Sequence, residues 1–296
     1  MIIVVGLAFE ARIAAGPGMH VVCGGDSRHL SATLAAAIAE ARMLFGDCPG
    51  IISFGVAGGL APQLRPGTCV IGSAILSGSN RMPTNHIWSQ QLLQTFPDAV
   101  SGMLLGVSAP ICDPRDKRAL HVNTGAIAVD MESHVVAAVG AAHGLPVAAM
   151  RVVTDPAERT LPASAVAAMR PNGTTNIGAM IRVMLMRPRE IPALFQTAFD
   201  ALAARATLVR GRRLLGPGLL LVNSLEGEPV TANEPYLGPA IQQQPWKVFN
   251  GPRCCAPNTL VEINDSPKSL PLKETVRLRG EMVPEGKSHE GFGRLH

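Results

Sequence analysis

The chain contains 296 residues, of which 47% are apolar and 4% are aromatic, and its formal net charge is +4. A chain of this size and apolar content can bury one large core or two small ones, built mainly from aliphatic side chains. The basic residues are scattered and form no stripe with interleaved aromatic residues. This distribution argues against a nucleic-acid-binding protein.

The six cysteines form no C-x-x-C pair, and the eight histidines show no metal-ligand spacing with them. We therefore expect no metal site, and thiols that are buried in a reducing compartment. The sequence opens on the strand-like "MIIVVG" without a basic segment, which argues against a signal peptide. The longest apolar run, "VVAAVGAAHGLPVAAM", is too short to span a membrane. These features predict a cytoplasmic protein.

Predicted strands and helices alternate along the first 217 residues. The strand-like runs are residues 2–6, 20–24, 51–56, 69–76, 103–109, 126–131 and 147–154. The helix-like stretches are residues 28–44, 87–96, 114–121, 132–143, 162–169, 174–186 and 190–208. This alternation predicts a three-layer α/β/α sandwich around a buried central sheet. The fourth run continues into glycine and serine, which would allow the sheet to bend toward a barrel.

The composition changes near residue 217. Residues 1–217 contain one lysine, Lys117, and 17 arginines, whereas residues 218–296 contain four lysines, nine prolines and only three alanines. The C-terminal part shows no sustained period of 2 or 3.6. We expect a catalytic domain over 1–217 and an irregular or disordered tail over 218–296, with a small folded module as the alternative.

Acidic residues stand where several predicted strands end. Glu10 follows the first strand, Asp130 and Glu132 follow the sixth, and Asp155 follows the seventh. Because ligands of α/β sheets collect at the carboxyl ends of strands, we expect these acids to share one edge with the glycine-rich "GVAGGL".

Each acid also has a simpler interpretation. Glu10 could be an exposed residue in the first turn of a helix, where the helix dipole favours a carboxylate. Asp155 could cap the turn that begins with its proline neighbour, and Asp26 is best explained as a helix N-cap. Asp130 and Glu132 have no such simple explanation, since they lie two residues apart where a predicted strand is followed directly by a helix. Burying a carboxylate there without a partner would be costly.

The motifs "GVAGGL", "VDME" and "RVVTD", in this order, resemble those of the nucleoside phosphorylase/nucleosidase superfamily. Its methylthioadenosine/S-adenosylhomocysteine nucleosidases are the most similar common members. The resemblance covers roughly residues 1–210 and implies a phosphorylase/hydrolase-like fold with a central mixed sheet. Within the superfamily, "VDMESHVVAAVGAAHGLPVAAMRVVTD" is most similar to the hopanoid-biosynthesis branch, which releases adenine from adenosylhopane. The resemblance also implies homo-oligomers and no cofactor.

The resemblance implies a role for each matching residue. Asp155 matches the acid that protonates purine N7, and Glu10 matches the base that orients the attacking water. Glu132 matches the glutamate that holds the ribose hydroxyls. The remaining implied substrate-binding residues are Met131 beneath the sugar, Ala57 and Gly58 near the anomeric carbon, Ile111 against the base, and Thr154 beside the acid.

The sequence departs from the nucleosidase pattern in two places. Gly24, Gly25, Asp26 and Ser27 stand where the nucleosidases have Gly-Ile-Gly-Lys, which changes what an anion would meet there. Thr154 replaces the usual serine and retains its hydroxyl.

Cleavage of a C–N glycosidic bond places positive charge on the sugar and negative charge on the base. An acid positioned at the base can contribute about 10²–10⁴-fold. Asp155 would therefore need a raised pKa, whereas Glu132 should stay ionised. We expect Asp130 to be its structural partner, facing away from the ligand.

The reaction could be hydrolysis, or phosphorolysis with phosphate as co-substrate. Arg28, Arg65 and Arg81 could hold a phosphate, but a carboxylate at position 10 would repel one and favours water. The alternatives are a nucleoside-binding protein without turnover and a dinucleotide-dependent oxidoreductase. The oxidoreductase is disfavoured because the first strand is followed by a lone glycine, Gly6, and not by G-x-G-x-x-G.

Residues 174–208 are apolar, rich in methionine and punctuated by arginines. They could form two packed core helices. The alternative is a lip of the pocket that contacts the membrane surface and admits a lipid-tailed substrate, with Arg182, Arg187 and Arg189 near the headgroups.

Overall fold

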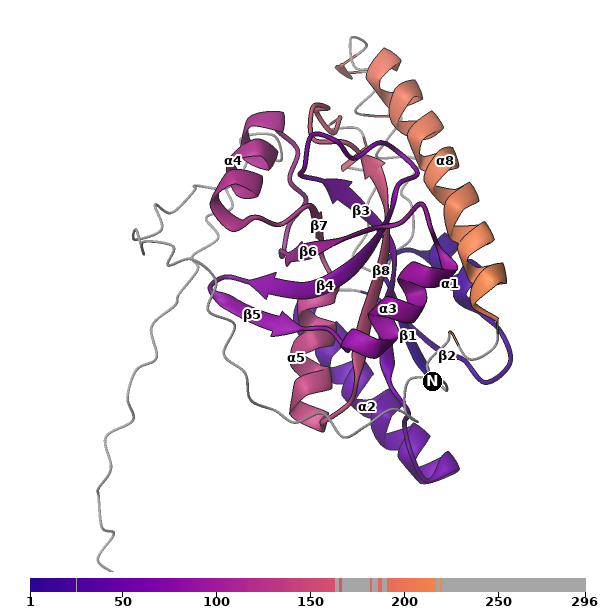
Figure 1. Ribbon diagram of the computed structural model, residues 1–296. Helices are drawn as coiled ribbons and strands as arrows, with labels where there is room; N and C mark the ends of the chain where they lie inside the picture. Colours follow the sequence, from indigo (N-terminus) through magenta and orange to yellow (C-terminus); the bar gives the residue numbers. More distant parts are fainter. Residues whose placement is uncertain are drawn as a thin grey trace, which may run out of the picture. The chain divides into compact units, whose positions relative to one another are not determined.

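The computed structural model describes residues 1–24, 26–162, 165–166, 182, 186–187, 191–216 and 219 (Figure 1). Most of the predicted helices 162–169 and 174–186 lies outside the described residues, as does the predicted tail apart from Leu219.

The described strands form one mixed sheet of eight strands. They are β1 (Ile2–Val5), β2 (His20–Cys23), β3 (Ile51–Gly59), β4 (Cys69–Ser77), β5 (Asn80–Pro83), β6 (Val100–Gly106), β7 (Ala128–Asp130) and β8 (Val147–Asp155). β1 pairs in parallel with β2 and β3, and β3 pairs in parallel with β8. The ends of β1, β3 and β8, which lead to the predicted site, therefore share one edge.

Part of the sheet closes into a ring. β8 pairs with both β3 and β4, β4 pairs with β6, β6 pairs with β7, and β7 returns antiparallel to β3. The register shifts at Ala57/Gly58 on β3 and at Gly72/Ala74 on β4. Such bulges increase local bending, which a closed ring requires. The closure brings the end of β7 beside the ends of β3 and β8.

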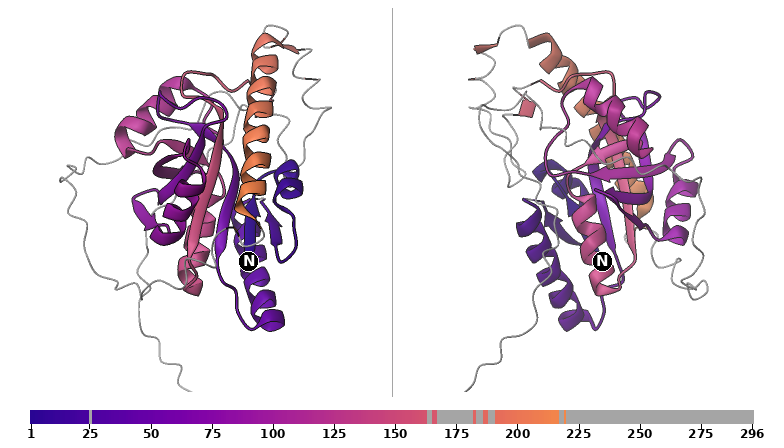
Figure 2. Two further views of the ribbon diagram at one scale, coloured as in Figure 1. Left: turned by 45° about the vertical axis from the view of Figure 1, so that its right-hand side comes forward. Right: turned by 90° about the vertical axis from the view of Figure 1, so that its left-hand side faces the viewer.

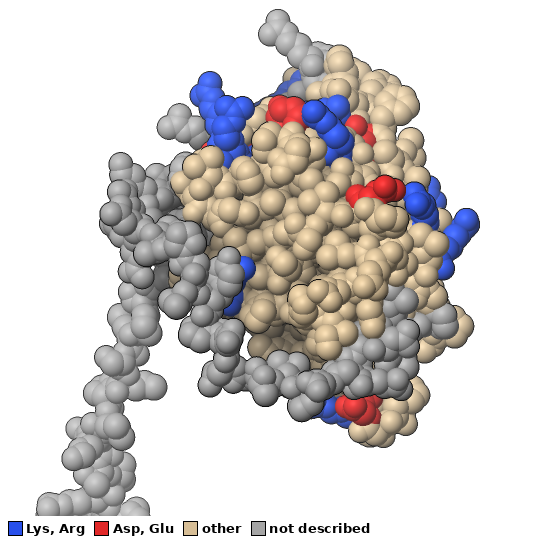
Figure 3. All heavy atoms as spheres, in the orientation of Figure 1, with Lys and Arg blue, Asp and Glu red and all other residues tan. Residues whose placement is uncertain are grey.

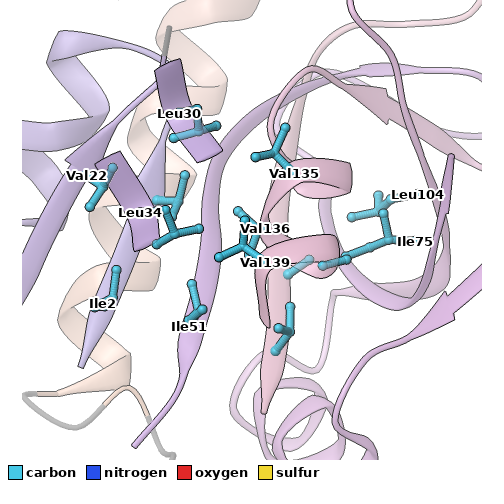
Figure 4. Close-up of a cluster of buried hydrophobic side chains, with 14 of the residues drawn as sticks. Ile2, Val22, Leu30, Leu34, Ile51, Ile75, Leu104, Val135, Val136 and Val139 are labelled. Carbon is cyan, nitrogen blue, oxygen red and sulfur yellow. The ribbon is translucent and has the colours of Figure 1, made fainter. Parts of the chain in front are cut away.

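Helices cover both faces of the sheet (Figures 1 and 2). They are α1 (Ala8–Ala14), α2 (Ser27–Phe45), α3 (His86–Thr95), α4 (Pro114–Thr124), α5 (Ser133–His143) and α8 (Ile191–Leu215). One face packs against α2 and α5 through an aliphatic core that includes Leu34, Ile51 and Val136 (Figure 4). The other face packs against α1, α3 and α8 through Phe54, Trp88 and Leu208. The predicted three-layer α/β fold is confirmed.

Local signals explain where the helices begin and end. The side chains of Asp26, Asn85 and Asp113 accept hydrogen bonds from the first turns of α2, α3 and α4. Gly46 and Gly125 end α2 and α4 in the left-handed conformation, which glycine adopts without steric cost. The interpretation of Asp26 as a helix cap agrees with this geometry.

All seven predicted strands occur, although β6 begins and ends about three residues earlier than residues 103–109. Two elements were not predicted. β5 is a polar, mostly exposed edge strand, and α1 has only seven residues. Neither is long enough to show a hydrophobic period.

The face shown in Figure 3 is largely uncharged at its centre, and its acidic and basic side chains are intermixed toward its margin. Among the described residues, none of the helices is both long and apolar enough to cross a membrane.

Candidate active site

A cavity of about 130 Å³ lies at the ends of β1, β3, β7 and β8. Its wall contains the eight catalytic and substrate-binding residues that the family resemblance implies: Glu10, Ala57, Gly58, Ile111, Met131, Glu132, Thr154 and Asp155. The structure thus brings together side chains that are up to 145 positions apart in the sequence.

Glu10 lies in the first turn of α1 with its carboxyl group fixed by the backbone. Oε2 accepts hydrogen bonds from the amides of Gly6 and Leu7, both at 2.8 Å, and Oε1 accepts one from Val56 at 2.7 Å. The residue is 1% exposed, so the interpretation as a solvated helix residue is wrong. Burial raises its pKa, while Arg151 and the three amides act in the opposite direction.

Of the two acids at the end of β7, Asp130 and Glu132, the first stabilises the local backbone. Asp130 Oδ1 accepts from the amides of Glu132 and Ser133, at 3.1 and 2.8 Å, and so fixes the start of α5. Its Oδ2 lies 2.8 Å from Nε of the buried Arg151, an ion pair without hydrogen-bond geometry. Asp130 therefore holds the turn on which Glu132 is mounted, as expected for a structural partner, although it also reaches the cavity wall.

Glu132 projects from this turn into the cavity. Its Oε2 lies 3.2 Å from Nη2 of Arg151, which comes from β8. A β-carbon at Gly6 would approach Glu132 Oε1 to 2.6 Å, so any larger residue at this turn would force the carboxyl group to shift. Burial raises the pKa of Glu132 to about 7, against the lowering effect of Arg151. This value differs from the expectation of a fully ionised Glu132, because the carboxyl loses more hydration than one shared arginine replaces.

Asp155 ends β8 and is held on both oxygens. Oδ2 lies 2.7 Å from Nζ of Lys117, and Oδ1 lies 3.2 Å from the hydroxyl of Thr154. That hydroxyl is also 3.4 Å from the carbonyl of Ala57. Burial raises the pKa of Asp155, and Lys117 is the largest opposing influence. A raised pKa is the direction that a general acid requires.

The rest of the wall is apolar. Val107, Pro110, Ile111, Val129 and Leu161 line it, and Met131 is 36% exposed at its margin. An apolar lining with a few fixed polar groups is typical of small-molecule sites. It also lowers the local dielectric, which strengthens each acid's effect on a bound ligand.

Sequence reasoning missed two charged residues of the site, Lys117 and Arg151. Lys117 could have been noticed as the single lysine of the first 217 residues. Arg151 could have been noticed because "AAMRVV" places an arginine inside a buried strand, where it needs acidic partners. The sequence did not reveal which acids those were.

The arginines considered for phosphate do not lie on the described cavity wall. Arg65 instead forms an exposed ion pair with Glu158 at 3.0 Å. Across the described ranges, no group of three or more His, Cys, Asp or Glu could hold a metal ion.

The sequence matches the family model of the phosphorylase superfamily over residues 5–185. The chain belongs to the phosphorylase superfamily. The match spans every residue of the cavity wall, from Gly6 to Leu161. None of the curated proteins matches the chain in sequence.

Several solved structures of other proteins are similar at low identity. A methylthioadenosine nucleosidase mutant of Helicobacter pylori with 5′-methylthioadenosine in its active site has 12% identity and a TM-score of 0.48, covering 72% of this chain and 96% of its own. A putative methylthioadenosine/S-adenosylhomocysteine nucleosidase of Francisella philomiragia has 12% identity and a TM-score of 0.49, covering 75% and 97%. Futalosine hydrolase of Helicobacter pylori has 13% identity and a TM-score of 0.47, covering 76% and 95%. At these scores, membership of the superfamily rests on the family model.

Proposed function

We propose that this protein is an N-glycosidase that hydrolyses a 5′-substituted adenosine and releases adenine. The observation that carries the proposal is the placement of Glu10, Glu132 and Asp155 around one cavity, each in a different electrostatic environment. Membership of the phosphorylase superfamily supports the same chemistry.

In the proposed mechanism, Asp155 donates a proton to N7 of the purine as the C–N bond breaks. The base then leaves neutral, and the positive charge remains on the sugar. Thr154 would fix the orientation of the acid through its hydroxyl. Protonation of a leaving group by a positioned acid is worth about 10²–10⁴-fold.

Glu132 would accept hydrogen bonds from the ribose hydroxyls. A pKa of about 7 suits this task, because donated hydrogen bonds from the hydroxyls would stabilise its ionised form as the sugar becomes cationic. Met131, at the margin of the cavity, would pack beneath the sugar, and Ile111 would contact the base.

Glu10 would orient the attacking water near the backbone of Ala57 and Gly58. Hydrolysis is favoured over phosphorolysis because the cavity presents several carboxyl groups, which repel a phosphate dianion. Three backbone amides already occupy the carboxyl group of Glu10, so it is held in place without help from a substrate.

For the substrate, we propose adenosylhopane, on the resemblance of residues 129–155 to the hopanoid branch. A cavity of about 130 Å³ is smaller than the roughly 300–1,000 Å³ of most ligand sites. The 5′ substituent of the substrate would therefore extend beyond the cavity. If this substituent is a lipid tail, it would need an apolar surface on the protein outside the cavity.

The outer side of α8 offers such a surface. Phe195, Phe199 and Leu202 follow one another at helical spacing and are exposed, while Ala204 and Leu208 on the opposite side are buried. We propose that this stripe contacts the membrane surface. Flotation with anionic vesicles should be weaker for Phe199→Ser than for Gln196→Ser, an exposed polar control on the same helix. Equal flotation of the two variants would argue against membrane contact by α8.

Three further expectations remain proposals, two on the change of composition near residue 217 and one on the family resemblance. Residues 1–217 form the catalytic domain, residues 218–296 form an irregular tail, and copies of the chain associate into homo-oligomers. Light scattering on the full chain and on a chain ending at residue 219 would test the last two together.

The decisive experiment incubates the purified protein with methylthioadenosine and with adenosine carrying a long 5′-alkyl chain. Free adenine is measured by chromatography, with and without phosphate. Release without phosphate supports hydrolysis, and release only with phosphate supports phosphorolysis. Ligand binding without any release supports a nucleoside-binding protein instead.

A further inference from the structure

The environment of Lys117 differs from that of an ordinary lysine. Its side chain is fully buried, and a buried ammonium is stable only when it is paired and hydrogen-bonded. Its three donors are all used: Asp155 Oδ2 at 2.7 Å, the carbonyl of Arg159 at 3.0 Å and the carbonyl of Pro156 at 3.1 Å.

This arrangement ties α4 to the end of β8. The two carbonyls belong to the loop that follows Asp155, so the ammonium group fixes both the acid and the backbone on its C-terminal side. Asp113 caps α4, and Leu120 packs α4 against the small core formed by Leu60, Leu105 and Val129. The helix that carries Lys117 is therefore anchored independently of the ion pair.

We infer that Lys117 is a positioning residue of the proposed reaction: its ammonium group holds Asp155 against the cavity and assists the carboxyl group in giving up its proton to the departing base. The inference rests on the proposed function. The proton moves from Asp155 to the base, which leaves Asp155 as a carboxylate beside the Lys117 cation, and solvent later reprotonates Asp155. The ion pair is strongest after this transfer, so Lys117 stabilises the state that forms as the bond breaks.

The neighbouring elements carry other charged residues. They are Glu10 on α1, Glu132 after β7, Arg151 on β8, Glu158 and Arg159 on the loop after β8, Asp113 at the N-cap of α4, and Arg115, Asp116 and Arg118 on α4. Glu158 and Arg159 are engaged with Arg65 and Asp200, and Arg151 is engaged with Asp130 and Glu132. Among the described residues, Lys117 is the cation within hydrogen-bonding distance of Asp155, and it is the largest influence that opposes the effect of burial on the Asp155 pKa.

The test is the pH dependence of adenine release by the full chain. Activity that needs protonated Asp155 falls at high pH with an apparent pKa that reports this acid. Removing an opposite charge at hydrogen-bonding distance raises the pKa of a carboxyl by about 1–3 units. In Lys117→Met, the fall of activity at high pH (the falling limb of the pH profile) should therefore move to higher pH by about that amount. The kcat of the variant below this pH should be lower than that of the wild type. Lys117→Arg, the matched control, keeps the charge and should leave the limb near its wild-type position.

An unchanged limb in a folded and active Lys117→Met protein would overturn the inference and leave the proposed function intact. Absence of adenine release from the wild type would instead overturn the proposed function.

Lys117→Met could fail to fold, which circular dichroism would reveal. In that case the wild type is labelled with ¹⁵N-lysine, and the Lys117 ammonium resonance is assigned with Lys117→Arg. This resonance should shift at the pH of the falling limb, and a resonance that shows no inflection there would contradict the inference.

Discussion

Replacing Glu132 by glutamine should make the protein more stable at pH 8 but not at pH 5. The carboxyl group of Glu132 is buried beside a single shared arginine, and its pKa is raised from 4.5 to about 7. A carboxyl whose pKa is raised on folding favours the native state while it is protonated. This contribution is fully present below pH 4.5 and is lost as the pH rises through 7.

The size of the effect follows from the pKa difference. A rise of about 2.5 pKa units corresponds to roughly 3 kcal/mol of unfolding free energy at about 1.4 kcal/mol per unit. The charges of Arg151, Asp130 and Glu10 also act on Glu132, so the measured difference will be smaller than this full value. We expect Glu132→Gln to gain about 1–3 kcal/mol relative to wild type between pH 5 and pH 8.

Urea unfolding at both pH values measures this gain directly. Glu40→Gln is the matched control, because Glu40 is exposed on α2 and keeps its hydration on folding. Its free-energy difference from wild type should be the same at both pH values. A pH-independent difference for Glu132→Gln would refute the electrostatic account of this carboxyl group.

The remaining predictions concern chemistry, fit and local stability. Asp155→Asn should reduce kcat for adenine release by at least about 10²-fold, because the acid is lost, and should also lower the thermal unfolding midpoint, because the buried Lys117 ammonium group loses its charged partner. Gly6→Ala should raise the KM more than it lowers kcat, because its β-carbon would approach Glu132 Oε1 to 2.6 Å; an unchanged KM would show that Glu132 does not hold the substrate. Asn85→Ala should lower the unfolding free energy by about 1 kcal/mol in urea titrations and leave kcat/KM unaltered, since Asn85 only caps α3 by accepting from the amide of Trp88.

The strands were predictable because each carries its own signal. "IIVV", "IISFGV" and "VAAMRVV" are apolar runs bounded by turn residues, and central parallel strands need such runs in any context. The long helices α2 and α5 were predictable for a related reason, since their apolar residues recur at helical spacing over several turns. α1 and β5 were missed because seven and four residues are too few to show a period.

The roles of the acids depended on contacts that the sequence does not encode locally. The simple interpretation of Glu10 was wrong because the amide of Val56, 46 positions away, donates a hydrogen bond to the buried carboxyl group of Glu10. The ionisation of Glu132 depends on Arg151 and on its depth of burial. Both are properties of the closed ring of strands.

By itself the sequence determined the alternation of strands and helices, the superfamily and the set of acids at the strand ends, because hydrophobic periods and short motifs act over a few residues. Only the tertiary structure decided that β7 returns to β3, that Arg151 serves both Asp130 and Glu132, and that Lys117 reaches Asp155. The physical reason is that pKa values and ion pairs depend on distance and dielectric environment, and these are set when distant segments pack together.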